Sequence, residues 1–377
     1  MEWEAEKKRG ICMNQKELRR RFRPEKHAIQ RIYGCYVSGA GEILSDLDEP
    51  LGRMPEEEAE KYLILFKKAL SGTIGKNLMD IVFSTQQVMD SPEHQLLSRL
   101  RDTELKDGEV RRTFYEQVIA ALDMEGRNYL ILLAHDCYHG RPGGDKIFSY
   151  IVCVICPVKD GRLELGYFSG ENEFHSSVMP QTVAVPEVGF LFPAFEEGQS
   201  NLYHALYYTR RSDGVHPELI DALFHTPPPM SAAQQQETFR MALQEGLGKA
   251  CTLDVLQGVY TGLWERMEEH KQSRVVEPLE VTAREVGDML QNCGVDPEGF
   301  LMRCRELFGS DAVLYPENLI DSRRFALKAG RATVWVEPEW THVVKQRVIE
   351  GCPYLLVPVS GKMEVNGMVL ESENGMV

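Results

Sequence analysis

The sequence predicts an α+β fold: a central, mostly antiparallel sheet flanked by helices, followed by a helical segment and a small α+β C-terminal domain. Three short runs rich in β-branched and aromatic residues, at 128–134, 148–158 and 163–168, are typical of strands. The Asp160-Gly161 pair between the last two runs predicts a hairpin, which joins antiparallel neighbours. Amphipathic helical patterns lie on both sides of these runs.

The first two runs are almost continuously apolar, so we expect other elements to cover both of their faces. The third run alternates Leu163, Glu164 and Leu165, which predicts one buried and one solvated face. Cys153 and Cys156 match a Cys-x-x-Cys motif, but residues three apart on a strand point to opposite faces. Buried free thiols are therefore the preferred interpretation of this pair over a redox or metal site.

The elements around the central runs follow from apolar periodicity and capping residues. Pro55 and the three glutamates after it suit the positively polarised first turn of a helix, so these carboxylates are interpreted as helix-start charges and not as a metal site. The segment 71–76 resembles a phosphate loop only superficially, because its spacing and its helix-then-strand order are wrong. The predicted helices are 14–22, 54–70, 85–101 and 109–122, and the predicted strands are 29–37, 42–47, 78–83 and 203–208.

A polar stretch at 268–278 is the predicted domain boundary. We expect residues 1–12 to be a disordered N-terminal extension and residues 13–270 to form the α+β main domain, with a long helical segment at its end. Residues 271–377 are predicted to form a small C-terminal domain of two short helices followed by β-hairpins.

Composition restricts the class of protein. The chain has 377 residues, of which 43% are hydrophobic and 26% charged, as is typical of a globular protein. Its longest apolar runs fall far short of the roughly 20 residues that cross a bilayer, and its nine cysteines without paired spacing favour reduced thiols. We therefore expect a cytoplasmic protein, with the nucleoid as the alternative location, and no membrane partner. The net charge of −15 disfavours diffuse electrostatic binding to nucleic acid.

A basic segment near the N-terminus is a local exception to this acidic balance. Only Glu17 and Glu25 oppose its seven cations, so one interpretation is an arm that contacts phosphates of nucleic acid. The alternative is a solvated helix face that pairs with the protein's own acidic surface. The residues of this basic segment are Lys16, Arg19, Arg20, Arg21, Arg23, Lys26 and Arg31.

Two clusters carry side chains that suit acid–base or metal chemistry. The first lies at 135–145, in a predicted loop after the first central strand, where imidazoles can serve as metal ligands or as a general base. The second lies at 170–175, where an extended backbone would turn alternate side chains to one side. Each also has a structural explanation, as an ordinary loop or a polar turn. The candidate catalytic residues are His135, Asp136, His139, Glu171, Glu173 and His175.

Five segments carry a resemblance to a known family. They read Gln-Arg-Ile-Tyr-Gly-Cys-Tyr at 30–36, Met-Pro-Glu-Glu-Glu-Ala-Glu-Lys-Tyr at 54–62, Leu-Ser-Gly-Thr at 70–73, Cys-Pro-Val-Lys-Asp-Gly at 156–161 and Gly-Glu-Asn-Glu-Phe-His at 170–175. With them the chain resembles domain of unknown function family 4317, a bacterial family found mainly in Firmicutes. The resemblance covers nearly everything after Met13. It implies a cytoplasmic bacterial protein, and it implies no activity.

The order of elements is also similar to that of the nucleoid-associated protein family of Gram-negative bacteria. In that family an α+β body precedes a helical stretch, two short helices and a β-hairpin tail. The segments 324–330, 333–336, 347–349 and 365–367 of this chain are similar to that closing tail. A function carried across this likeness is an analogy based on architecture.

The preferred hypothesis is a non-enzymatic nucleoid- or nucleic-acid-associated protein, in which the basic segment contacts phosphates and a homodimer forms. One alternative is a metal-dependent enzyme that uses the 135–145 and 170–175 loops. Another is a protein–protein interaction module whose C-terminal region docks a partner. No cofactor motif is present, so no cofactor is predicted. Whether the chain is an enzyme stays open, and the interpretation leans against it.

Overall fold

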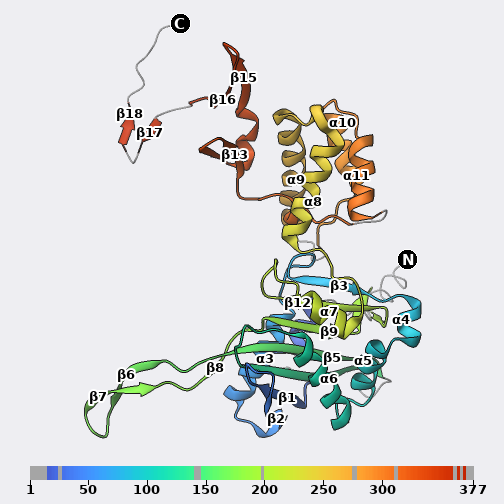
Figure 1. Cartoon of the computed structure of the whole chain (residues 1–377), viewed down its shortest axis with the longest axis vertical. Coiled ribbons are helices and arrows are strands. Elements are labelled where there is room, and N and C mark those ends of the chain that lie inside the picture. Colours follow the sequence, from blue (N-terminus) through green and yellow to red (C-terminus); the bar gives the residue numbers. More distant parts are fainter. Residues whose placement is uncertain are drawn as a thin grey trace, which may run out of the picture. The chain divides into compact units, whose positions relative to one another are not determined.

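The computed structural model describes residues 15–23, 28–139, 146–196, 199–273, 278–309, 313–359, 363–365 and 368–370. The chain divides into two compact units, residues 1–231 and 232–377 (Figure 1). The predicted extension at 1–12 lies outside the described residues.

A large antiparallel sheet forms the centre of the first unit, which confirms the predicted α+β class. Its strands follow the order β2-β1-β4-β5-β9-β12-β3, so the two long apolar strands β4 and β5 lie in the middle. They pair antiparallel along most of their length. The short strand β8 pairs with the end of β5. The strands are β1 (Arg31–Val37), β2 (Ile43–Pro50), β3 (Leu78–Val82), β4 (Tyr129–His139), β5 (Lys146–Lys159), β8 (Thr182–Val183), β9 (Val188–Phe192) and β12 (His204–Thr209).

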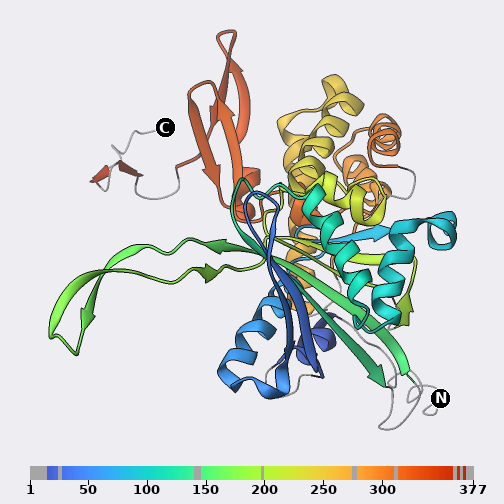
Figure 2. The same cartoon turned by 60° about the horizontal axis from the view of Figure 1, so that its bottom comes forward.

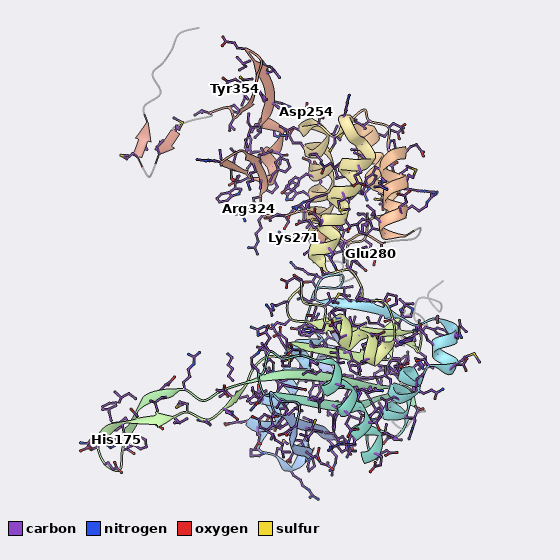
Figure 3. The ribbon with its side chains drawn as sticks, viewed as in Figure 1. His175, Asp254, Lys271, Glu280, Arg324 and Tyr354 are labelled. Atoms are coloured by element: carbon purple, nitrogen blue, oxygen red, sulfur yellow. The ribbon has the colours of Figure 1, made fainter. Side chains whose placement is uncertain are left out.

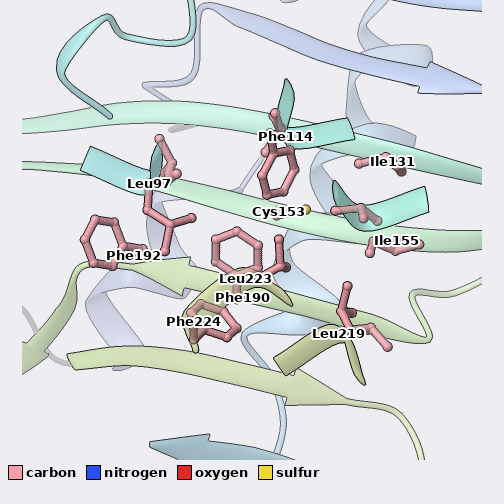
Figure 4. Packing of buried hydrophobic residues seen from close by; sticks show 14 of the residues in the cluster. Leu97, Phe114, Ile131, Cys153, Ile155, Phe190, Phe192, Leu219, Leu223 and Phe224 are labelled. Carbon is pink, nitrogen blue, oxygen red and sulfur yellow. The ribbon is translucent and has the colours of Figure 1, made fainter. Parts of the chain in front are cut away.

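Helices cover both faces of this sheet, as the continuous apolar runs predicted. On one face Ile131 and Cys153 pack with Phe114 of α6 and Phe224 of α7 (Figure 4). On the other face Leu132 and its neighbours pack with residues of α2 and α3. The helices of this unit are α2 (Gln15–Arg21), α3 (Glu56–Ala69), α4 (Thr85–Asp90), α5 (Pro92–Asp102), α6 (Gly108–Ala121) and α7 (Pro217–Phe224).

Cys153 and Cys156 belong to the two different core clusters, so their thiols lie on opposite faces of β5. Both are free and fully buried. The prediction of two inert, separated thiols is confirmed, because strand alternation keeps side chains three residues apart on opposite sides.

A two-stranded antiparallel ribbon follows β5 and extends away from the sheet (Figures 1 and 2). It consists of β6 (Leu163–Phe168) and β7 (Glu173–Val178), and nearly all of its residues are exposed. The prediction that β6 has one buried face is wrong, because no element of the described chain packs on the ribbon. A smaller ribbon pairs β10 (Ala194–Glu196) with β11 (Gln199–Asn201).

The second unit begins with helices that share one apolar core. Gly246 of α8 lets α11 approach closely, since a Cβ there would lie 2.6 Å from the Phe300 Cα. This packing explains why the division falls at residue 231 and not in the expected stretch at 268–278: the long helical segment belongs with the helices after it. The helices are α8 (Ala232–Leu247), α9 (Leu253–Ser273), α10 (Ala283–Asn292), α11 (Glu298–Phe308) and α12 (Pro316–Leu319).

Three small hairpins complete the second unit, in agreement with the predicted β-rich tail. They expose several large apolar side chains, including Trp335, Val348 and Tyr354. Within the ranges that the structure covers, no helix has the length and apolar character needed to cross a bilayer. The strands are β13 (Phe325–Ala329), β14 (Ala332–Val336), β15 (Lys345–Ile349), β16 (Cys352–Leu356), β17 (Met363–Val365) and β18 (Met368–Leu370).

Candidate functional site

Arg19 of the basic segment donates hydrogen bonds to its own chain. Its Nε lies 2.6 Å from the Leu70 carbonyl oxygen, and its guanidinium also reaches the Gly72 carbonyl at 3.4 Å. These carbonyls follow α3, where helix-end acceptors lack intrahelical donors. Burial lowers the pKa of Arg19. The side chain therefore caps α3 and joins α2 to it.

Arg21 enters a buried ion pair with Asp136 of β4. Two guanidinium nitrogens lie 2.5 and 2.8 Å from the carboxylate oxygens, and the Tyr150 hydroxyl donates to the same carboxylate at 2.5 Å. Burial opposes the charge of Arg21, but the hydrogen bonds and charge of Asp136 outweigh it and raise the Arg21 pKa. Burial, reinforced by Asp136, raises the pKa of Tyr150 well above its usual value. Asp136 thus anchors α2 to the sheet.

The other cations of the basic segment divide into three groups. Arg31 forms an exposed ion pair with Asp48 on the neighbouring strand β2. Arg20 and Arg23 are exposed. The Lys16 side chain and all of Lys26 lie outside the described residues.

The candidate cluster at His135 lies on a strand and not in the predicted loop. Pairing with β5 continues to His139, which extends β4 past the apolar run. Strand alternation then separates the cluster: Asp136 faces α2, while His135 and Cys137 share the other face. Ser149 of β5 lies directly opposite Cys137 and therefore joins them. The His139 side chain and residues 140–145 lie outside the described residues.

His135, Cys137 and Ser149 form a contact group at this end of the sheet. The His135 Nε2 lies 2.9 Å from the Ser149 Oγ and 3.6 Å from the Cys137 Sγ. A cavity of about 530 Å³ opens beside His135 and Cys137. Its wall also carries the charged residues Arg31, Glu104, Lys106 and Asp136. A thiol, an imidazole and a cavity that could hold a ligand thus lie together.

The second candidate cluster comes together on the ribbon. The His175 Nε2 lies 2.9 Å from a Glu171 carboxylate oxygen and 3.5 Å from one of Glu173. All three side chains are exposed, and Figure 3 shows His175 on the ribbon, away from the sheet. Across the described ranges, no group of three or more His, Cys, Asp or Glu side chains has an arrangement that could hold a metal ion. The cluster is a set of surface contacts between His175 and the two glutamates.

The two candidate clusters do not meet. His135 lies opposite Ile151 near the start of β5, whereas the ribbon begins beyond Lys159 at the other end. At about 3.3 Å per residue, the sites are more than roughly 20 Å apart. His135 and Asp136 are therefore too far from Glu171, Glu173 and His175 to bind one metal ion with them, because most of β5 separates the two groups.

The ribbon carries an apolar face that sequence reasoning missed. Its register places Leu163 opposite Val178 and Tyr167 opposite Phe174, with Leu165 between them on the same side. These five side chains are between 53% and 71% exposed. The other face carries Glu164, Glu173 and His175, together with Phe168, whose ring packs on His175. The alternation was visible in the sequence, but only the register across the turn shows that these five apolar residues of the two strands lie on the same side.

The comparisons with known proteins give a family and no activity. The model of the family described as "Domain of unknown function (DUF4317)" matches residues 13–368. A search of curated proteins finds no match to the chain.

Proposed function

Because this chain belongs to the domain of unknown function family DUF4317, which supplies no activity, we propose its function from its geometry. The protein is a protein–protein interaction module that forms a homodimer through the apolar face of the β6–β7 ribbon. The observation that carries this proposal is the row of five exposed apolar side chains on one face of the ribbon, opposite a polar face.

The size of this apolar face supports a role in binding. Five apolar side chains at this exposure present on the order of 500 Å², which is the size of the largest patch on a typical monomer and usually marks a function. An isolated two-stranded hairpin is also only marginally stable in water. A partner that covers this face would remove the apolar area from water and stabilise the ribbon.

A second copy of the chain fits the size and shape of the surface. Two such faces together bury about 1,000 Å² or slightly more, which reaches the lower range of specific interfaces. A two-fold axis is the commonest symmetry of homodimers, and it would set the Leu163–Val178 end of one ribbon against the Tyr167–Phe174 pair of the other. Aliphatic side chains would then pack on aromatic rings at about the 10 Å spacing of stacked sheets.

Charge favours this occupant over nucleic acid. The polar face of the ribbon carries Glu164 and Glu173, with Glu171 in the turn, so it would repel phosphates. In the basic segment, Arg19 and Arg21 donate to groups of their own chain and have fewer hydrogens left for phosphate. In a face-to-face dimer the glutamates would point outward into solvent, where their repulsion is screened.

The test is sedimentation velocity over roughly 1 to 100 µM protein. The wild type is expected to shift from monomer to dimer as concentration rises. A Leu165→Glu, Phe174→Glu variant should stay monomeric, because a carboxylate buried in an apolar interface loses its hydration. Its thermal midpoint at low concentration should match that of the wild type, since both side chains are exposed in the single chain.

A matched control changes the other face of the same ribbon. The Glu164→Gln, His175→Gln variant alters two exposed polar residues and should dimerise like the wild type. A wild type that is monomeric at the highest concentration, or a double glutamate variant that dimerises normally, would contradict the proposal. Retention of duplex DNA at low salt by the monomeric variant would instead favour nucleic-acid association.

A further inference from the structure

Cys137 differs from most cysteines of the first unit because it is accessible. It lines the cavity beside β4, whereas Cys35, Cys153 and Cys156 are fully buried. Reaction of a thiol needs both access and a route for its proton. The position of Cys137 supplies the access.

His135 supplies the route for the proton. Its Nε2 lies 3.6 Å from the Cys137 Sγ, and the two residues are two apart on one strand, so backbone geometry holds them on the same face. The same nitrogen lies 2.9 Å from the Ser149 Oγ on the neighbouring strand. This contact limits rotation of the imidazole and keeps it beside the thiol.

From these contacts we infer that Cys137 is a thiol–disulfide exchange site for low-molecular-weight disulfides that carry both ammonium and carboxylate groups. This activity is independent of the dimer proposed above, because it uses the opposite end of β5. His135 is the positioning base, and the cavity of about 530 Å³ is the space for the incoming disulfide.

The exchange balances without any further reactant. The Ser149 hydroxyl turns its hydrogen away from the His135 Nε2, and the Cys137 thiol gives its proton to that nitrogen. The thiolate then attacks one sulfur of the disulfide. A new sulfur–sulfur bond forms between Cys137 and that half of the ligand. The original bond breaks, its electron pair leaves on the other sulfur, and this leaving thiolate takes the proton from His135. Cys137 is oxidised and the released half is reduced to a thiol.

The charges around the cavity select the class of disulfide. The cavity wall carries the cations Arg31 and Lys106 and the anion Glu104. The Lys106 Nζ lies 2.6 Å from a Glu104 carboxylate oxygen, and Arg31 pairs with Asp48 of β2. A zwitterionic ligand can place a carboxylate beside Lys106 or Arg31 and an ammonium beside Glu104. An uncharged disulfide of similar reactivity gains none of these contacts.

The experiment treats the native full-length protein with oxidised glutathione and follows each cysteine by peptide mass spectrometry. Exposed Cys352 in the second unit is the internal reference. Cys137 is expected to form the mixed disulfide faster than Cys352. His135→Gln should slow Cys137 about tenfold or more and leave Cys352 unchanged, because it removes the proton acceptor. Ser149→Ala should cause a smaller loss.

Two controls separate this effect from general damage. His204→Gln changes a histidine that pairs with Asp80 on the far strands, and it should leave Cys137 as reactive as in the wild type. If the buried Cys153 and Cys156 stay unmodified by oxidised glutathione, the variant is folded. A Cys137 that stays unmodified while Cys352 reacts, or an equal rate in His135→Gln, overturns the proposal.

A second probe tests the ligand class. Hydroxyethyl disulfide is uncharged, so the ratio of the Cys137 rate to the Cys352 rate should be several-fold lower with it than with oxidised glutathione. Equal ratios for the two disulfides would overturn the assignment to zwitterionic ligands.

Discussion

Strands β5 and β6 are neighbours in the chain, yet they have opposite surroundings. Nearly every described side chain of β5 is buried, because α5, α6 and α7 cover one face and α2 and α3 the other. The residues of β6, which three residues separate from β5, are almost all exposed. The hairpin predicted at Asp160-Gly161 is wrong, because β6 pairs with β7 and β5 pairs with β4, β8 and β9. Both β5 and β6 carry strand-forming residues in antiparallel pairs. Local preference therefore predicts the strand, while burial depends on which elements return to cover it.

This difference separates residues that stabilise the fold from residues that are available for binding. The central sheet gains its stability from apolar area removed from water on two faces. The ribbon has backbone pairing with no such cover in the described chain, so its apolar side chains add little to the fold of a single molecule. Residues that contribute little to the fold but remain apolar are candidates for binding.

The sharpest test of this division compares two phenylalanines. Phe114 is fully buried against the sheet, whereas Phe174 on the ribbon is 64% exposed. Phe114→Ala should lower the free energy of unfolding by about 4 kcal/mol, through lost burial and a cavity. Phe174→Ala should change it by less than about 0.5 kcal/mol. Urea unfolding at a concentration that keeps the chain monomeric measures both, and equal losses would refute the division.

A smaller effect is expected from the ion pair that ties α2 to the sheet. Arg21→Ala leaves the buried Asp136 carboxylate without its cation and with the Tyr150 hydroxyl donating to it, at a cost of roughly 3 kcal/mol. The matched control is Arg112→Ala, which breaks an exposed pair with Glu116 and should leave the unfolding midpoint unchanged. If Arg21→Ala is as stable as the control, α2 is not anchored through this contact.

The sequence allowed much of the fold to be predicted and less of the sites. The two buried strands and the helix that begins after Pro55 depend on neighbouring residues, and local rules predict them well. The contact of Arg21 with Asp136 joins residues 115 positions apart. No pattern of neighbouring residues predicts a contact over this distance in the sequence, so the sequence alone allowed the basic segment to be interpreted as a binding arm.

The site at Cys137 shows a second limit. The glycines and proline after His139 favoured a loop over 135–145, and a loop gives no rule for which side chains share a face. Once pairing with β5 extends β4, alternation groups His135 with Cys137 and sends Asp136 to the other side. The residues were correctly noticed, but their grouping required the register.

The smallest expected effect concerns alkaline pH, and it again separates the sheet from the ribbon. Burial raises the pKa of Cys35 on β1 to about 12, from its usual value near 9. The folded chain therefore keeps this proton where the unfolded chain releases it, so the stabilising contribution is complete below pH 9 and is lost as pH rises toward 12. One such thiol should cost about 1.4 kcal/mol per pH unit in this window.

Cys35→Ala removes this titrating thiol, so the unfolding free energy of the variant should fall less steeply than that of the wild type between pH 9 and pH 10.5. From pH 9 to pH 10 the wild type should lose about 1 kcal/mol more than the variant. Chemical unfolding at each pH measures the slope. Cys352→Ala, which alters an exposed thiol, should follow the wild type. The ribbon contains no cysteine, so its deletion should leave this slope intact. A Cys35→Ala slope identical to that of the wild type would mean that the Cys35 thiol ionises in the folded chain as readily as in the unfolded one, which contradicts its burial in the sheet.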